Sequence, residues 1–167
     1  MRSIVKVPED RIPVLIGKGG SVKKEIENTT KTRILVFRDV SIDGGPLEVI
    51  RASEIVRAIG KGFNPKTAML LLDEDYELAI IKIDQKEGHR RRVLSRLIGR
   101  KGKVRKYIEE LTGAHISVYG KTVCIIGLHE QVDVAGNAVE HIIEGKSHGF
   151  VYGRIRKLRQ SSRNYPL

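Results

Sequence analysis

Several residue types that define common protein classes are scarce in this 167-residue chain. Tryptophan is absent and aromatic residues make up 5%, which argues against a protein that stacks bases on an aromatic platform. The single cysteine, Cys124, excludes an intramolecular disulfide and a cysteine-rich zinc site, and it fits a reduced compartment. The longest apolar run, at 68–72, is far shorter than the roughly 20 residues of a membrane-spanning helix. We therefore expect a cytoplasmic protein with no membrane partner.

Patterns that carry catalysis or metal binding are also missing. The five histidines show no metal-ligand spacing such as H-E-x-x-H. The string GKGGS lacks the G-x-x-x-x-G-K-[ST] spacing of a phosphate loop, and no serine stands in a nucleophile elbow. The acidic run at 73–75 has no complementary nucleophile, so we interpret it as a loop. We expect no enzyme, no metal and no cofactor.

Positive charge is abundant and unevenly distributed. The formal net charge is +11, which favours an anionic partner such as nucleic acid. Residues 1–82 contain 14 Lys and Arg against 12 Asp and Glu, whereas residues 83–167 contain 17 against 8. The segment 88–108 holds nine cations and no acid, and like charges at helical spacing repel one another unless a polyanion is near. The second half is therefore predicted to contact a polyanion more strongly.

The chain repeats itself with an offset of 82 residues around a glycine turn. Aligning Gly17 with Gly99 also aligns Gly20 with Gly102, and it matches apolar positions on both sides of the turn. Two domains of about 70–85 residues follow, each near the lower limit for a self-sufficient core. Alternation and helical spacing predict the order β-α-α-β-β-α in both copies. Predicted strands are 3–7, 33–37 and 47–51 in the first copy, and 76–84, 115–119 and 122–126 in the second.

Each glycine turn precedes a predicted helix and displays cations. A helix start leaves backbone N–H groups unpaired and carries partial positive charge, so an anion can bind there. Glycines allow a tight turn and a close approach by a phosphate. The two residues between the glycines, Arg100 and Lys101 in the second copy, can pair with phosphates. Two ordinary turns remain the alternative, but two copies in register disfavour it.

The motif I-G-x-x-G, found twice in a β-α-α-β-β-α frame, resembles the KH domain in its type I form. The resemblance covers nearly the whole chain and implies an α+β fold of two type I KH domains, each an antiparallel three-stranded sheet with helices on one face. In KH domains the G-x-x-G loop clamps the backbone of about four nucleotides of single-stranded nucleic acid. The expected boundaries are a first domain at 1–63, an apolar helical connector at 64–75, a second domain at 76–153 and a basic C-terminal tail at 154–167.

The segments around the two units narrow the resemblance further. The connector and the string GFVYGRIRKLR make the chain similar to archaeal members of the partner-of-Nob family of small-ribosomal-subunit assembly factors. That resemblance implies binding of single-stranded ribosomal RNA near the small-subunit 3′ end by the second unit, with ribosome-assembly proteins as possible partners. In eukaryotic members the first glycine loop is degraded. Here Gly17, Gly19 and Gly20 are all present, so a role of the first unit in RNA binding stays open.

The predicted RNA-binding positions surround the two glycine turns. In the first unit they are Gly17, Lys18, Gly19, Gly20 and Lys23; in the second they are Arg96, Ile98, Gly99, Arg100, Lys101, Gly102, Lys103, Val104, Lys106, Ile116 and Val118. The apolar positions would line a groove for bases, although some of them must belong to the core. The tail at 154–167, with five cations and no acid, is either a disordered arm that contacts RNA or a solubilising end.

Two other functions remain open from the sequence. A general RNA chaperone, or a KH subunit of an RNA-processing complex, would carry the same loops and charge. A nucleic-acid-acting enzyme or its subunit is disfavoured because no catalytic constellation is present. RNA binding without turnover separates the last class from the others.

Overall fold

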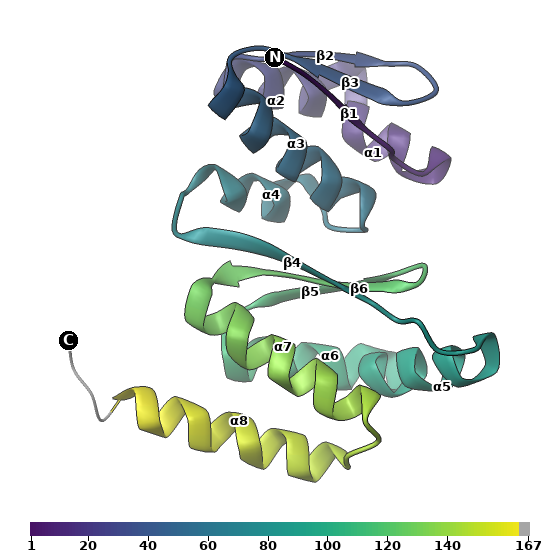
Figure 1. The fold of residues 1–167 in the computed structure, drawn as a ribbon, viewed down its shortest axis with the longest axis vertical. Helices are drawn as coiled ribbons and strands as arrows, with labels where there is room; N and C mark the ends of the chain where they lie inside the picture. Colours follow the sequence, from purple (N-terminus) through teal and green to yellow (C-terminus); the bar gives the residue numbers. More distant parts are fainter. Residues whose placement is uncertain (164–167) are drawn as a thin grey trace. The chain divides into compact units, whose positions relative to one another are not determined.

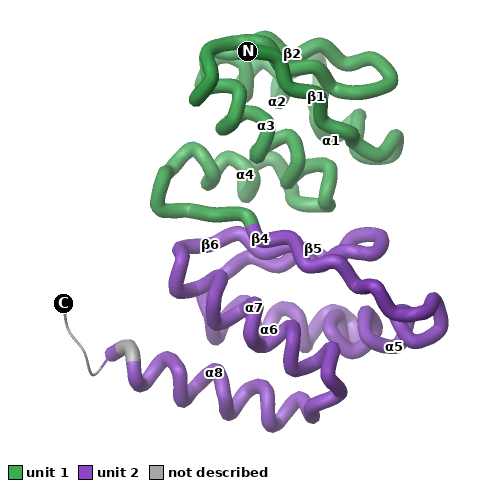
Figure 2. Tube along the Cα trace, viewed as in Figure 1, with its two compact units in different colours: residues 1–78 green, residues 79–167 purple. Residues whose placement is uncertain are grey.

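The computed structural model describes residues 1–163 and divides the chain into two compact units, Met1–Leu78 and Ala79–Leu167 (Figure 2). Within the described residues, no helix combines the length and the apolar character that crossing a bilayer requires. Each unit contains one three-stranded sheet and its own helices.

The first unit follows the predicted β-α-α-β-β-α order and then adds a short helix (Figure 1). Its sheet has the order β1-β3-β2 with antiparallel pairing, and the register places Ile34 opposite Ile42. Both of these side chains are fully buried in the core of the first unit. Its elements are β1 (Arg2–Val5), α1 (Ile12–Ile16), α2 (Ser21–Thr30), β2 (Arg33–Val36), β3 (Val40–Asp43), α3 (Pro46–Gly60) and α4 (Pro65–Ala68).

The strand predicted at 47–51 is wrong. These residues form the start of α3, and the third strand in chain order is Val40–Asp43, which none of the predicted strands includes. Pro46 occupies the first turn of α3, where its fixed φ and missing N–H cost nothing. Leu47 and Ile50 are exposed on that helix, which produced the misleading apolar alternation.

The connector segment packs within the first unit. Asn64 caps α4 by accepting a hydrogen bond from the Thr67 N–H at 2.8 Å. Helix α4 and the 3₁₀ turn Met69–Leu72 both contact α3, and Ala68 and Leu71 are buried there. The apolar run at 68–72 therefore contributes to a core.

The second unit repeats the order and adds a long final helix. Its sheet order is β4-β6-β5, with β5 and β6 antiparallel. Buried side chains of α6, α7 and the sheet form the core. Its elements are β4 (Tyr76–Lys82), α5 (Glu87–Ile98), α6 (Lys103–Thr112), β5 (His115–Tyr119), β6 (Thr122–Leu128), α7 (His129–Ile143) and α8 (His148–Arg163).

Helix α8 includes residues 154–163 of the predicted basic tail, so of its two interpretations the disordered arm is wrong for these residues. It packs on α6 and α7, and Val151 and Ile155 are buried in the core at i, i+4 spacing. Arg159 donates a hydrogen bond to the Leu111 carbonyl near the end of α6. The basic tail is thus a structural helix as far as Arg163, and residues 164–167 lie outside the described residues.

Candidate nucleic-acid interface

The two G-x-x-G loops have nearly identical backbones. Gly17 and Gly99 both adopt φ 73° and ψ 176° and end the helix before the turn. In each loop the N–H of the last glycine donates to the carbonyl of the first at 3.2 Å. Gly20 and Gly102 then adopt left-handed geometry immediately before α2 and α6. The sequence repeat is therefore also a structural repeat.

The first glycine of each loop is required by close packing as well as by its backbone angles. A Cβ added at Gly99 would lie 2.3 Å from Val104 Cγ2 and 2.9 Å from the Val104 nitrogen. The same addition at Gly17 would lie 2.4 Å from Val22 Cγ2. No non-glycine residue fits a contact this short without moving backbone. The turn is thus held against the first residues of the following helix.

The second loop carries a cation in a conformation that normally belongs to glycine. Lys101 has φ 55° and ψ 29°, whereas the equivalent residue of the first loop is Gly19 with φ 62°. A left-handed conformation costs an L-residue roughly 1–2 kcal/mol. The second loop therefore keeps a lysine where glycine would be easier to accommodate.

The start of α6 offers backbone donors beside these cations. Gly102 stands at the N-cap and provides no side chain, so the first N–H groups of α6 have no side-chain cap within residues 1–163. Such a helix start binds anions through its free N–H groups and its dipole. Arg100, Lys101 and Lys103 are exposed around it. An extended phosphate backbone can therefore contact donors and cations together.

The remaining predicted positions divide by burial. Lys18, Gly19 and Lys106 are exposed, Gly17, Gly20, Gly102 and Val118 are half-buried, and Ile98 is exposed by 36%. Val104 and Ile116 are 8% and 5% exposed and belong to the core of the second unit. These two side chains therefore support the groove from below and have little surface to offer a base.

Arg96 differs most from its predicted role. Its guanidinium donates from Nη1 to the Ile142 carbonyl at 3.1 Å and from Nη2 to the Lys146 carbonyl. The Ile142 carbonyl, which also accepts from the Gly145 N–H at 3.0 Å, lies at the C-terminal end of α7, and the Lys146 carbonyl lies just beyond it. Arg96 therefore fastens α5 to α7, and its contact with RNA stays a prediction.

In the first unit another arginine, at a position that is not equivalent in the repeat, also binds two carbonyls near the end of a helix. Arg11 donates to the carbonyls of Ile59 and Phe63 at 2.8 and 2.7 Å, at the end of α3. Sequence reasoning missed both arginine clamps because their partners lie 46 or more residues away in the chain.

Lys23 is partly committed to an ion pair. Its Nζ lies 3.4 Å from Glu27 Oε1, which also accepts a hydrogen bond from the Ile34 N–H at 2.6 Å. In the second unit Arg105 pairs with Glu109, which accepts from the Ile116 N–H. Both pairs join the helix after the loop to the neighbouring strand, so their first role is to hold the groove wall.

A pocket beside the second loop contains residues that sequence reasoning did not single out. It lies between α6 and α8 and includes Tyr107, Glu110 and Tyr152 next to Lys103 and Lys106. Burial, and to a lesser extent Tyr107, raises the pKa of the Tyr152 phenol above its ordinary value. The low aromatic content concealed this site because the two rings that the described residues contribute to it come from distant segments.

The comparisons with known proteins agree with this geometry. Residues 77–160 match the model described as eukaryotic type KH-domain, KH-domain type I, and residues 2–58 match the KH domain model. A KH domain-containing protein of Methanocaldococcus jannaschii is 46% identical, over 94% of this chain and 74% of its own length. The pre-rRNA-processing protein pno1 of Aspergillus fumigatus is 27% identical, over 82% of this chain and 57% of its own.

A solved structure covers almost the entire chain. The complex of a/eIF2alpha, aDim2p and rRNA from Pyrococcus horikoshii contains a chain with 44% identity and a TM-score of 0.87, covering 99% of this chain and 96% of that one. This chain spans 41% to 59% of the length of several eukaryotic relatives, so it is similar to about half of each. The predicted α+β fold with two KH domains is confirmed. The chain belongs to the Pno1/Dim2 family of proteins with two KH domains.

Proposed function

We propose that this protein binds single-stranded ribosomal RNA near the small-subunit 3′ end during ribosome assembly, without catalysing a reaction. A relative is named for pre-rRNA processing, and a 44% identical chain was crystallised with rRNA and a/eIF2alpha. These names support RNA as the ligand class. They also support a protein partner that is present at the same time as the RNA.

One observation carries the proposal: the second G-x-x-G loop displays Arg100 and the left-handed Lys101 in front of the uncapped start of α6. Phosphate groups would pair with the two cations and accept hydrogen bonds from the first N–H groups of α6. Bases would then turn toward Ile98 and Val118, the apolar predicted positions that retain exposed surface. This arrangement favours single strands because their bases are free to enter a groove.

The first unit is proposed to bind RNA more weakly. Its loop has the same backbone but carries one cation, Lys18, and its half of the chain is nearly balanced in charge. Counterion release makes affinity depend on the number of phosphates that are neutralised. The first unit would therefore add a smaller, salt-sensitive contribution.

The test is binding of a labelled oligonucleotide that matches the 3′ end of small-subunit rRNA, measured by fluorescence anisotropy with Mg²⁺ present. A scrambled RNA of equal length and composition is the matched control. We expect the 3′-end RNA to bind at least tenfold more tightly and to remain intact, about 1.4 kcal/mol of discrimination. Equal affinity for both RNAs would favour a general RNA chaperone. Cleavage or modification of the RNA would contradict the assignment as a non-enzymatic protein.

A further inference from the structure

An open pocket of about 470 Å³ lies between α6 and α8 of the second unit. Its volume falls within the roughly 300–1,000 Å³ typical of small-molecule sites. Lys103 directly follows the last glycine of the loop and is also the first residue of the pocket wall. The pocket therefore begins where the G-x-x-G loop ends. Its lining residues are Lys103, Val104, Lys106, Tyr107, Glu110 and Tyr152.

Two tyrosine rings from different helices form an ordered wall of this pocket. Tyr107 of α6 and Tyr152 of α8 meet edge to face, with ring centroids 4.6 Å apart and planes at 89°. Arg156 donates a hydrogen bond to the Tyr107 hydroxyl and also lies near that ring. The rings are thus held in place before any ligand binds, which lowers the entropy that binding must overcome.

The charge of the pocket suits a phosphate. Lys103 and Lys106 are exposed lysines on its wall, and Glu110 is the one acidic residue that the described part of the chain places in the lining. A nucleotide combines a phosphate with a flat base, and aromatic side chains stack on bases regardless of sequence. Lysines and tyrosines placed side by side match both parts of such a ligand.

The first unit has a pocket in the corresponding place with different chemistry. A pocket of about 570 Å³ between α2 and α4 is lined by Glu25, Asn64, Pro65, Lys66 and Met69. Glu25 occupies the position equivalent to Tyr107 at the repeat offset of 82 residues. Among residues 1–163, its lining contains no aromatic ring, and a carboxylate replaces the tyrosine. The shape recurs in both units, but the features that suit a nucleotide occur in the second.

We propose that the α6–α8 pocket is an additional RNA subsite, which takes a nucleotide beyond the four or so that the KH groove holds. The phosphate lies between Lys103 and Lys106, and the base packs against Tyr152. The RNA would pass over Arg100 and Lys101 and continue onto the side of α6 that faces α8. This inference rests on the proposed RNA-binding function and gives α8 a part in it.

The test compares short and long RNA on the full chain. A short oligonucleotide of about five nucleotides fills the groove alone, and two longer versions extend it by four nucleotides at the 5′ or the 3′ end. We expect one extension to increase affinity. Tyr152→Leu and Lys106→Ala should each lower the affinity for that long RNA at least about fivefold more than for the short one. Tyr152→Phe, which keeps the ring, should retain the gain.

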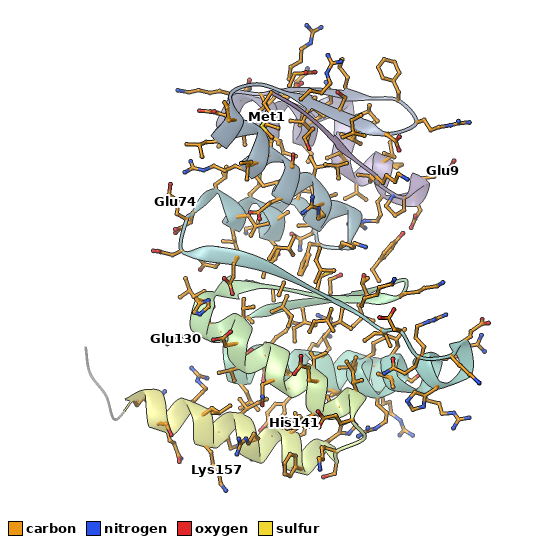
Figure 3. All side chains as sticks on the ribbon, in the orientation of Figure 1. Met1, Glu9, Glu74, Glu130, His141 and Lys157 are labelled. Atoms are coloured by element: carbon orange, nitrogen blue, oxygen red, sulfur yellow. The ribbon has the colours of Figure 1, made fainter. Side chains whose placement is uncertain are left out.

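A matched control lies on the same helix. Lys157 is exposed on the side of α8 away from α7 (Figure 3), so Lys157→Ala removes a cation without touching the pocket. It should bind long and short RNA like the unaltered protein.

The possible outcomes separate this inference from the proposed function. If extension at either end brings no gain, or if the pocket variants keep the gain, the subsite is wrong while RNA binding by the groove stands. The subsite is also wrong if Lys157→Ala loses the gain as fully as Lys106→Ala. If the unaltered chain binds none of the RNAs, both proposals fail. Thermal unfolding identifies a variant that has lost its fold, and Lys106→Ala decides alone if Tyr152→Leu has done so.

Discussion

The two glycine loops have one backbone and two different surfaces. Gly17 and Gly99 share the same dihedral angles, and Gly20 and Gly102 differ by only a few degrees in φ. Between them the first loop carries Lys18 and Gly19, and the second carries Arg100 and Lys101. The first loop uses glycine at the left-handed position, whereas the second tolerates strain to present a cation. Loop geometry is therefore a property of the fold, and charge distinguishes the stronger expected binder.

The largest effect on stability should come from replacing the first glycine of the loop, whose backbone angles the two loops share. Gly99→Ala should destabilise the second unit by about 3 kcal/mol or more, because φ 73° with ψ 176° is essentially restricted to glycine and the new Cβ would meet Val104. Gly102→Ala is the matched control, since a Cβ there would meet Lys106 Cε and Arg105 Nη2 at ordinary contact distances of 3.9 and 4.0 Å, and the left-handed angle alone costs roughly 1–2 kcal/mol. Urea denaturation measures both. A cost at Gly99 no larger than at Gly102 would contradict the packing argument.

Reversing the charge of each loop should lower RNA affinity more for the second loop than for the first. Replacing Arg100 and Lys101 by Asp should weaken RNA binding about tenfold to a hundredfold, because two charge-assisted phosphate contacts are lost. The slope of log affinity against log salt should flatten by about 1.4. Lys18→Asp with Gly19→Asp should cost less, and circular dichroism should stay native in both proteins. An equal loss in the first unit would mean that both loops share the RNA.

Removing each arginine clamp tests whether it stabilises its own unit to the same extent as the other clamp stabilises the other unit. Arg96→Ala leaves the carbonyls of Ile142 and Lys146 without their guanidinium partner and should lower stability by about 2 kcal/mol. Arg11→Ala should do the same through Ile59 and Phe63. The salt dependence of RNA binding should not change for Arg96→Ala. A flatter slope at full stability would instead support the predicted contact of Arg96 with RNA.

The smallest effect should come from a substitution that makes the second loop resemble the first. Lys101→Gly should raise stability by about 1 kcal/mol by removing a left-handed lysine, while it lowers RNA affinity a few-fold through one lost phosphate contact. Thermal denaturation and anisotropy titrations on the same preparation measure both. A rise in stability with unchanged affinity would show that Lys101 does not contact RNA.

Local signals made the loops and the order of elements predictable from the sequence. The G-x-x-G turn needs specific residues at fixed spacing, so Gly99 and Gly102 identify it without tertiary information. The error at 47–51 arose where a half-exposed helix mimicked strand alternation. Pro46 was the overlooked sign of a helix start there. Val151 and Ile155 at i, i+4 could likewise have revealed α8 within the basic tail.

Long-range contacts account for what the sequence could not predict. The binding of Arg96 to carbonyls near the end of α7 depends on how two helices pack, and no local pattern records it. The tyrosine pair is similar, because Tyr107 and Tyr152 are separated by two strands and a helix. A composition that is poor in aromatics says little about where the few rings gather.

The arginine clamps also limit how far the role of a residue in one copy predicts the role of the aligned residue in the other copy. When the two copies are aligned on their glycine turns, Arg11 corresponds to Val93 and Arg96 corresponds to Val14. Each arginine therefore has a valine at the equivalent position of the other copy. The two copies thus use arginines at different positions of the repeat to bind carbonyls at the end of the corresponding helix. A residue-by-residue transfer of roles between the halves would therefore assign both arginines wrongly, even though the two units share the order β-α-α-β-β-α.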